Sequence, residues 1–126
     1  MIRLSSHAFA GALILAMAPV LFTAAYSGES GECLLQVDGQ TYIDGPCNIE
    51  LVKGGSFSIA VGETQASKYS AHVTRDPDTG RASGFWNGAD AAPAGHEDLG
   101  NLVRDEGCWF NERAKVCAWK PGTRPK

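Results

Sequence analysis

Beyond residue 27, apolar and polar side chains alternate along the chain in short runs separated by turn residues. Residues 56–61 alternate at a period of two, which is typical of a strand with one buried face. Residues 68–74 alternate less cleanly, and residues 81–86 follow as a partner strand after residues 76–80. We predict a turn over 76–80, because its proline fixes φ and its glycine accepts a positive φ.

The same pattern predicts a hairpin near each end of this region. Leu34–Val37 and Thr41–Ile43 flank Asp38-Gly39. Asp-Gly between two apolar runs is a strong signal for a two-residue hairpin turn. A second hairpin is expected over residues 108–119, with its turn at residues 112 and 113.

Two segments carry no clear period. Residues 87–95 are rich in Gly, Ala, Asp and Pro and predict a long loop, which on a small rigid domain is functional or disordered. Leu99–Arg104 fits a short helix or a strand, and Gly100 counts against the helix. No segment after residue 27 is long and periodic enough for a stable helix. We therefore predict an all-β fold, a small antiparallel β-barrel or sandwich of about eight short strands with two disulfides.

The four cysteines all lie beyond the uncharged N-terminal stretch. In a small exported domain, four cysteines predict two disulfides. Three pairings are possible, and we favour Cys33–Cys47 and Cys108–Cys117 because each pair encloses one predicted hairpin. Loops this short each add on the order of 2–3 kcal/mol of stability. The chain has no Cys-x-x-Cys pair, which argues against a zinc site and a redox-active dithiol.

The N-terminal region has the pattern of a secretion signal. Residues 8–27 carry no charge, and Thr23-Ala24-Ala25 supplies small residues for a cleavage site. A retained membrane anchor is the alternative, since these 20 uncharged residues are just long enough to span a bilayer. We expect a signal peptide over 1–25, a flexible leader over 26–32, a β-domain over 33–120 and a disordered tail over 121–126. Cleavage predicts a periplasmic or secreted protein without membrane contact.

Length and charge exclude several classes of function. The 126 residues correspond to one domain, which excludes a large multidomain enzyme. The net charge is −3, and it becomes −4 when Arg3 leaves with the signal. No basic cluster is present, so we expect no nucleic-acid partner. We also expect no cofactor and no resident metal.

Motifs of common enzymes are missing from the sequence. It has no Gly-x-Ser-x-Gly, no Gly-rich phosphate loop and no His-Glu-x-x-His, so we expect a protein that is not an enzyme. The mature chain keeps two histidines, His72 in a predicted strand and His96 after the long loop. An alternative remains: a small periplasmic metal-binding protein or enzyme that uses His72, His96 and Asp98. That alternative requires the three side chains to lie close together.

Aromatic residues mark the candidates for binding. Phe85-Trp86 ends a strand, and Trp109-Phe110 lies in the second cysteine hairpin. Adjacent strand residues face opposite sides, so one ring of each pair faces outward. Phe110 shares a face with Cys108, so we expect Trp109, together with Trp86, to be the exposed rings. The alternative is that these rings fill a core that is poor in leucine. The expected binding residues are Ser83, Trp86, Asn87, His96, Asp98 and Trp109.

Residues 82–86, Ala-Ser-Gly-Phe-Trp, followed by residues 99–104 and the last cysteine hairpin, resemble the small bacterial inhibitors of C-type lysozyme. Those are exported antiparallel β-barrels with a Ser-Gly loop motif, and their loops enter the lysozyme cleft with a Ser and a Lys. The resemblance spans residues 82–117 and implies an inhibitory role for Ser83 alone, because residues 87–103 contain no lysine.

A second likeness covers residues 37–47 and 98–109, which are similar to uncharacterised small secreted bacterial proteins. It implies export and disulfides but no activity. Taken together, the sequence predicts an exported, non-catalytic binding module that acts on a protein or glycan of the cell envelope. Lysozyme inhibition is the sharpest form of this hypothesis. A structural envelope protein without a discrete site is a further alternative, and it predicts no concave aromatic patch.

Overall fold

A computed structural model describes residues 28–61 and 68–126, and the predicted signal peptide lies outside the described residues. Eight antiparallel strands close into a barrel in chain order, which confirms the all-β prediction and selects the barrel over the sandwich. The strands are β1 (Glu29–Val37), β2 (Gln40–Leu51), β3 (Phe57–Ala60), β4 (Ser70–Arg75), β5 (Ala82–Trp86), β6 (Glu97–Asp105), β7 (Cys108–Phe110) and β8 (Ala114–Trp119).

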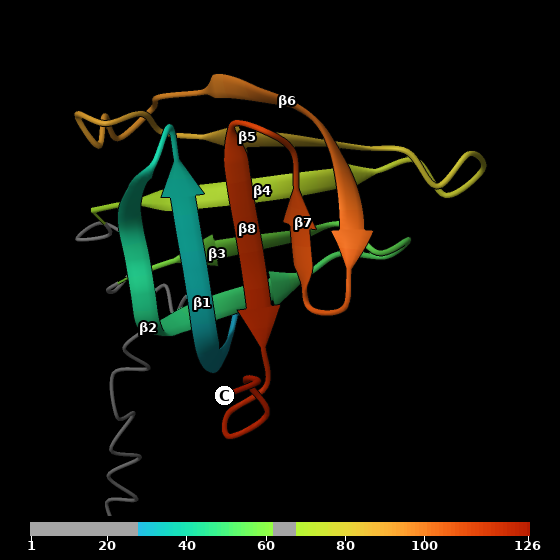
Figure 1. Cartoon of the computed structure of the whole chain (residues 1–126), viewed down its shortest axis with the longest axis horizontal. Helices are drawn as coiled ribbons and strands as arrows, with labels where there is room; N and C mark the ends of the chain where they lie inside the picture. The colour runs from blue at the N-terminus through green and yellow to red at the C-terminus, as the bar shows by residue number, and fades with distance from the viewer. Residues whose placement is uncertain (1–27, 62–67) are drawn as a thin grey trace, which may run out of the picture.

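The strands form two crossing layers (Figure 1). β1, β7 and β8 stand upright in front, β3 to β5 run across behind them, and β2 and β6 turn the corners between the layers. The register of the β5–β6 pair shifts beside Gly100, whose φ is +85°. Glycine adopts this φ without strain, and a bulge of this kind bends a strand. Residues 99–104 are therefore strand, and Gly100 lies where β6 carries its bulge.

Both predicted hairpins form. Asp38 and Gly39 have φ of 51° and 78°, as a type I′ turn requires, and they connect β1 to β2. In the second hairpin the Asn111 amide donates to the Ala114 carbonyl, which leaves residues 112 and 113 as the turn. The two disulfides join Cys33 to Cys47 and Cys108 to Cys117, which confirms the favoured pairing.

The domain extends further at both ends than the sequence predicts. Residues 29–32, expected as part of a flexible leader, pair with residues 46–49 of β2, because β2 is long enough to offer them a partner. In the tail, expected to be disordered, Arg124 forms an ion pair of 2.7 Å with Asp44. Its guanidinium also lies 4.9 Å from the centre of the Trp119 ring. The tail is thus held against the barrel.

The core fills the inside of the barrel, where inward positions alternate with outward ones along each strand. The Cys33–Cys47 disulfide lies inside this core, whereas Cys108 and Cys117 belong to a small second cluster. Leu34 and Trp119 complete the second cluster. In the core, the fully buried side chains besides cysteine are Leu35, Val37, Ile59, Val73 and Val116.

Candidate functional site

The prediction that Trp86 and Trp109 are exposed is wrong. Both are buried core residues, 4% and 7% exposed. Residues of opposite parity do face opposite sides, so Phe110 is exposed and Phe85 is half-buried. The error is in which face points inward. The prediction placed Trp109 on the exposed face, but a barrel with few leucines needs these large rings to fill its interior.

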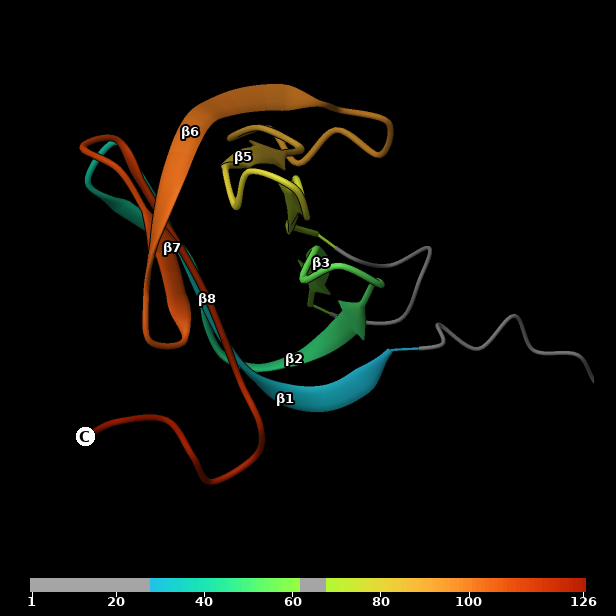
Figure 2. The ribbon, with the colours of Figure 1, turned by 90° about the vertical axis from the view of Figure 1, so that its right-hand side faces the viewer.

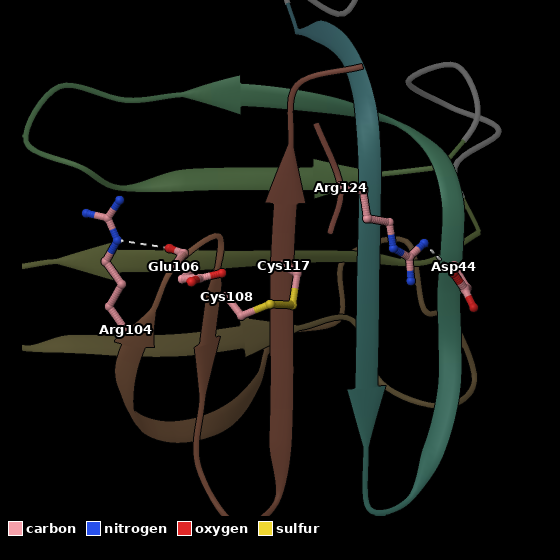
Figure 3. Close-up of a disulfide and its surroundings, with 6 residues drawn as sticks. All are labelled: Asp44, Arg104, Glu106, Cys108, Cys117 and Arg124. Carbon is pink, nitrogen blue, oxygen red and sulfur yellow. Dashed lines mark hydrogen bonds and ion pairs between the residues drawn. A yellow bond between two sulfur atoms is a disulfide. The ribbon is translucent and has the colours of Figure 1, made fainter. Parts of the chain in front are cut away.

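The Cys108–Cys117 disulfide (Figure 3) belongs to the second cluster, whereas Trp109 belongs to the core inside the barrel. It joins the first residue of β7 to the facing residue of β8. A cavity of about 630 Å³ lies over it, lined by Cys108, Phe110, Trp119 and Arg124 among others. Three acidic and three basic residues line this cavity, so its charge favours no single class of ligand.

Asn87, another predicted binding residue, is buried and has a structural role. Its side-chain oxygen accepts from the Ser70 amide at 3.1 Å, and its side-chain nitrogen donates to the Lys68 carbonyl at 2.9 Å. Asn87 therefore fastens the end of β5 to the start of β4. Because both polar atoms are already bonded, the residue has little capacity left for a ligand.

Ser83 and Asp98 lie on the outer face of the barrel. Ser83 is half-buried in β5, and its Oγ lies 3.5 Å from Oδ1 of Asn101 on β6. Asp98 is exposed, and its Oδ1 accepts from the Gly100 amide at 2.6 Å. Both residues remain accessible, but Ser83 lies within a strand and not on a loop.

His96 belongs to a ring cluster that we define by His72, Phe85 and His96. The ring centres lie 5.1 Å apart for His72–Phe85, 4.4 Å for Phe85–His96 and 5.0 Å for His72–His96. The interplanar angles are 21°, 18° and 7°, so the three rings are nearly parallel. The Nε2 atoms of the two histidines lie 3.2 Å apart, which allows an N–H···N hydrogen bond.

Register across the sheet explains how this ring cluster forms. Ser58 on β3 pairs with His72, His72 pairs with Phe85, and Phe85 pairs with Asp98. Paired residues on neighbouring strands face the same side of a sheet. His96 ends the 87–96 loop and lies against the same pair. The sequence places His72 out of phase with its apolar neighbours, which predicts its outward position, but 24 residues separate the two histidines.

Burial lowers the pKa of the His72 imidazole below its ordinary 6.5, and the charge of nearby His96 lowers it further. The neutral form of His72 is therefore favoured at neutral pH. A neutral imidazole has one donor and one acceptor nitrogen, so it can hydrogen-bond or bind a metal through a free lone pair.

The two ends of the barrel differ in what fills them. We call the end next to the 38–39, 87–96 and 111–113 connections the closed end. There the Tyr42 ring lies 4.7 Å from the Trp86 ring and 5.0 Å from the Tyr69 ring. We call the other end, next to the 52–56, 76–81 and 106–107 connections, the open end. There two cavities border Trp109. Figure 2 turns the side with the 52–56 and 76–81 connections toward the viewer.

Comparison of the chain with protein-family models, with curated protein sequences and with solved structures finds no match. In the described ranges, no group of three or more His, Cys, Asp or Glu residues could hold a metal. The same ranges contain no helix of the length and apolarity needed to cross a membrane. The two intramolecular disulfides indicate an oxidising environment outside the cytoplasm.

Proposed function

We propose that this protein is an exported, non-catalytic binding module of the periplasm or the cell exterior. Its binding surface is the outer face of β4, β5 and the start of β6. The observation that carries the proposal is the ring cluster of His72, Phe85 and His96. Together with Ser83 and Asp98, this cluster replaces the surface that the sequence predicts around Trp86, Asn87 and Trp109.

The chemistry of this face favours an envelope glycan as the partner. Sugars present C–H faces that pack on flat rings and hydroxyls that need both donors and acceptors. The ring cluster supplies the flat rings, and the neighbouring Ser83–Asn101 pair supplies a hydroxyl and an amide. A stable protein partner would be expected to cover a larger surface, of about 800 Å² on this chain.

The proposal is tested by co-sedimentation of the purified oxidised domain with insoluble peptidoglycan. We expect the wild-type protein to sediment and His72→Ala and Phe85→Ala to lose at least ten-fold in affinity. Gln36→Ala is the matched control, because Gln36 is a polar residue on β1 whose side-chain amide donates to the Thr41 hydroxyl, and β1 does not pair with the strands of the ring cluster. Wild-type protein that stays in the supernatant, or variants that sediment equally, would refute the glycan proposal.

Lysozyme inhibition is the sharper form of the proposal and has its own test. C-type lysozyme would be titrated with the domain while lysis of a peptidoglycan suspension is followed. If Ser83 acts in the lysozyme cleft, inhibition is stoichiometric and Ser83→Ala weakens it. Lack of inhibition at micromolar protein would exclude lysozyme inhibition. Glycan binding would then be tested by sedimentation alone.

A second candidate function is metal binding, and the histidine geometry favours it. Two nitrogens bound to one tetrahedral zinc ion lie about 3.3 Å apart, close to the 3.2 Å between the two Nε2 atoms. Asp98, the third residue of the predicted set, instead accepts from the Gly100 amide. Calorimetric titration with Zn²⁺ tests this candidate, and micromolar binding that His96→Ala abolishes would support it over glycan binding.

A further inference from the structure

The open end of the barrel holds two cavities of about 490 and 440 Å³ that share three lining residues. The shared residues are Arg75, Arg104 and Trp109. Leu102 and Ala82 add apolar surface to the first cavity, and Phe57 and Leu51 add it to the second. Leu51 is 72% exposed at the rim. Mouths of β-barrels are common ligand sites, and these volumes suit a small molecule.

Positive charge gathers at this mouth although the whole chain carries a net charge of −3. Arg75 and Arg104 line both cavities and Arg81 lines the larger one. Within residues 28–61 and 68–126, the ion pairs are Arg113–Asp38 and Arg124–Asp44, and neither involves an arginine of the mouth. Three arginines thus line the larger cavity, and none of them forms an ion pair within these residues, although the charge of Arg75 helps to lower the pKa of neighbouring Asp76.

The structure already positions two of these guanidinium groups. Nη1 of Arg75 donates to the Gly54 carbonyl at 3.0 Å, which holds the side chain against the β2–β3 connection. Nε of Arg104 donates to the Glu106 carbonyl at 3.2 Å (Figure 3). Each contact uses one of the five donor hydrogens of a guanidinium, so most donors remain for a ligand.

The carboxylates near the mouth offset its positive charge only in part, since Asp76 interacts with Arg75 but neither Arg81 nor Arg104 forms an ion pair in the described part of the chain. Asp76 follows Arg75 in the chain, and its Oδ1 accepts from the Asp78 amide within its own turn. Glu106 lines the smaller cavity, and it contacts Arg104 through its backbone carbonyl. The larger cavity has no acidic residue in its lining, so its local charge is positive.

We infer that the open end binds a small amphipathic anion, a carboxylate or phosphate attached to a short apolar group. The anion would meet Arg81 and Arg104, and the apolar part would pack on Trp109 and Leu102. Guanidinium groups bind carboxylates and phosphates through paired hydrogen bonds, and these are stronger than bonds between neutral groups. This site goes beyond the proposed glycan surface, because it uses other residues at the other end of the barrel.

Calorimetry with four probes tests both halves of the ligand. Octanoate and octyl phosphate carry an anion and a chain, 1-octanol carries the chain alone, and inorganic phosphate carries the anion alone. We expect octanoate or octyl phosphate to bind at least ten-fold more tightly than either single-feature probe, and the tighter of the two identifies the head group. Equal affinity for 1-octanol, or no binding of either anion at millimolar concentration, would overturn the inference.

Variants then locate the site. The double variant Arg81→Gln/Arg104→Gln should bind the preferred anion at least ten-fold more weakly and leave 1-octanol binding unchanged. Lys115→Gln, which removes one positive charge on β8 outside these cavities, is the control for net charge. In NMR spectra of the wild-type protein, the Trp109 indole N–H should shift on titration. An anion affinity that the double variant retains, or that Lys115→Gln lowers equally, would contradict the site.

Discussion

The closed and open ends of the barrel show two ways of using buried aromatic rings. At the closed end, Trp86 packs within 5 Å of Tyr42, and the Tyr69 hydroxyl donates to the Ala89 carbonyl of the long loop. At the open end, Trp109 is also buried in the core, but two cavities that are also lined by arginines border it. Burial alone therefore does not separate a residue surrounded by packed rings from one that borders a cavity.

The covalent cross-links follow the same division. Cys108 begins β7 at the open end, and Cys47 lies in the second half of β2, toward the 52–56 turn. Neither disulfide belongs to the ring contacts of the closed end. The closed end is stabilised by packing, whereas the open end combines cross-linked strands with charged groups that gain little from burial.

The largest expected effect comes from truncating the two buried tryptophans. Trp86→Ala should cost about 3–5 kcal/mol, as is usual for a large ring removed from a packed core. Trp109→Ala should cost less, because water from the adjoining cavities can enter the space that the ring leaves. Urea denaturation measures both free energies of unfolding. Equal losses, or a larger loss for Trp109→Ala, would show that the open end is packed as tightly as the closed end.

The disulfides give the next largest effect. Replacing Cys108 and Cys117 with alanine should cost about 2–3 kcal/mol, since the cross-link restricts the unfolded chain. Replacing Cys33 and Cys47 should cost more, because the loop is longer and the sulfur atoms also leave the core. Melting temperatures of the two double variants and of the reduced protein provide the measurement. A melting temperature that reductant does not change would show that the cross-links add no stability.

A smaller loss of unfolding free energy is expected for a substitution at Gly84, between the two ends of the barrel. Gly84 faces inward in the middle of β5, and a Cβ there would lie 2.6 Å from Cδ1 of Leu102 and 3.3 Å from Cβ of Leu99. Gly84→Ala should cost about 1–2 kcal/mol, within the usual range for overpacking. The cost stays moderate because Leu102 borders a cavity and can move toward it. A loss as large as that of Trp86→Ala in the same urea experiment would mean that the cavity does not relieve the strain.

Local patterns in the sequence were enough to predict the hairpins, the pairing of the cysteines and the parity of the strands. Asp38-Gly39 defines its turn by itself, and each cysteine pair is joined by a single hairpin. Parity is a local property, but the direction of the barrel interior is not. Trp86 and Trp109 were assigned to the wrong side because the interior is decided by how all eight strands close.

The candidate sites depend on contacts that are distant in sequence. His72 and His96 meet only because β4, β5 and the start of β6 are neighbours in the sheet. Arg75, Arg81 and Arg104 come from three separate segments, and no spacing rule connects them to Trp109. Ser83, His96 and Asp98 were predicted as accessible site residues, and they remain accessible. What the sequence lacked was the register that surrounds them with Phe85, His72 and Asn101.

The smallest expected effect is a pH dependence of the free energy of unfolding, which arises from His72 on the outer surface near the closed end. Because the pKa of His72 is lower in the folded protein than its ordinary 6.5, the unfolded chain binds more protons just below that pH. The free energy of unfolding should therefore fall as pH decreases from 7.5 toward 5, by less than about 1.4 kcal/mol per pH unit for one proton.

Urea denaturation of wild-type protein and His72→Gln at pH 7.5, 6.5, 5.5 and 5.0 measures this dependence. The window stays above the range where Asp76 titrates, since the pKa of that carboxyl is lowered, mainly by the Asp78 amide. His72→Gln should remove most of the slope, whereas an Arg81→Gln change at the open end should leave it intact. A slope that persists in His72→Gln would place the responsible proton elsewhere. The ring cluster would then add no pH dependence to the free energy of unfolding.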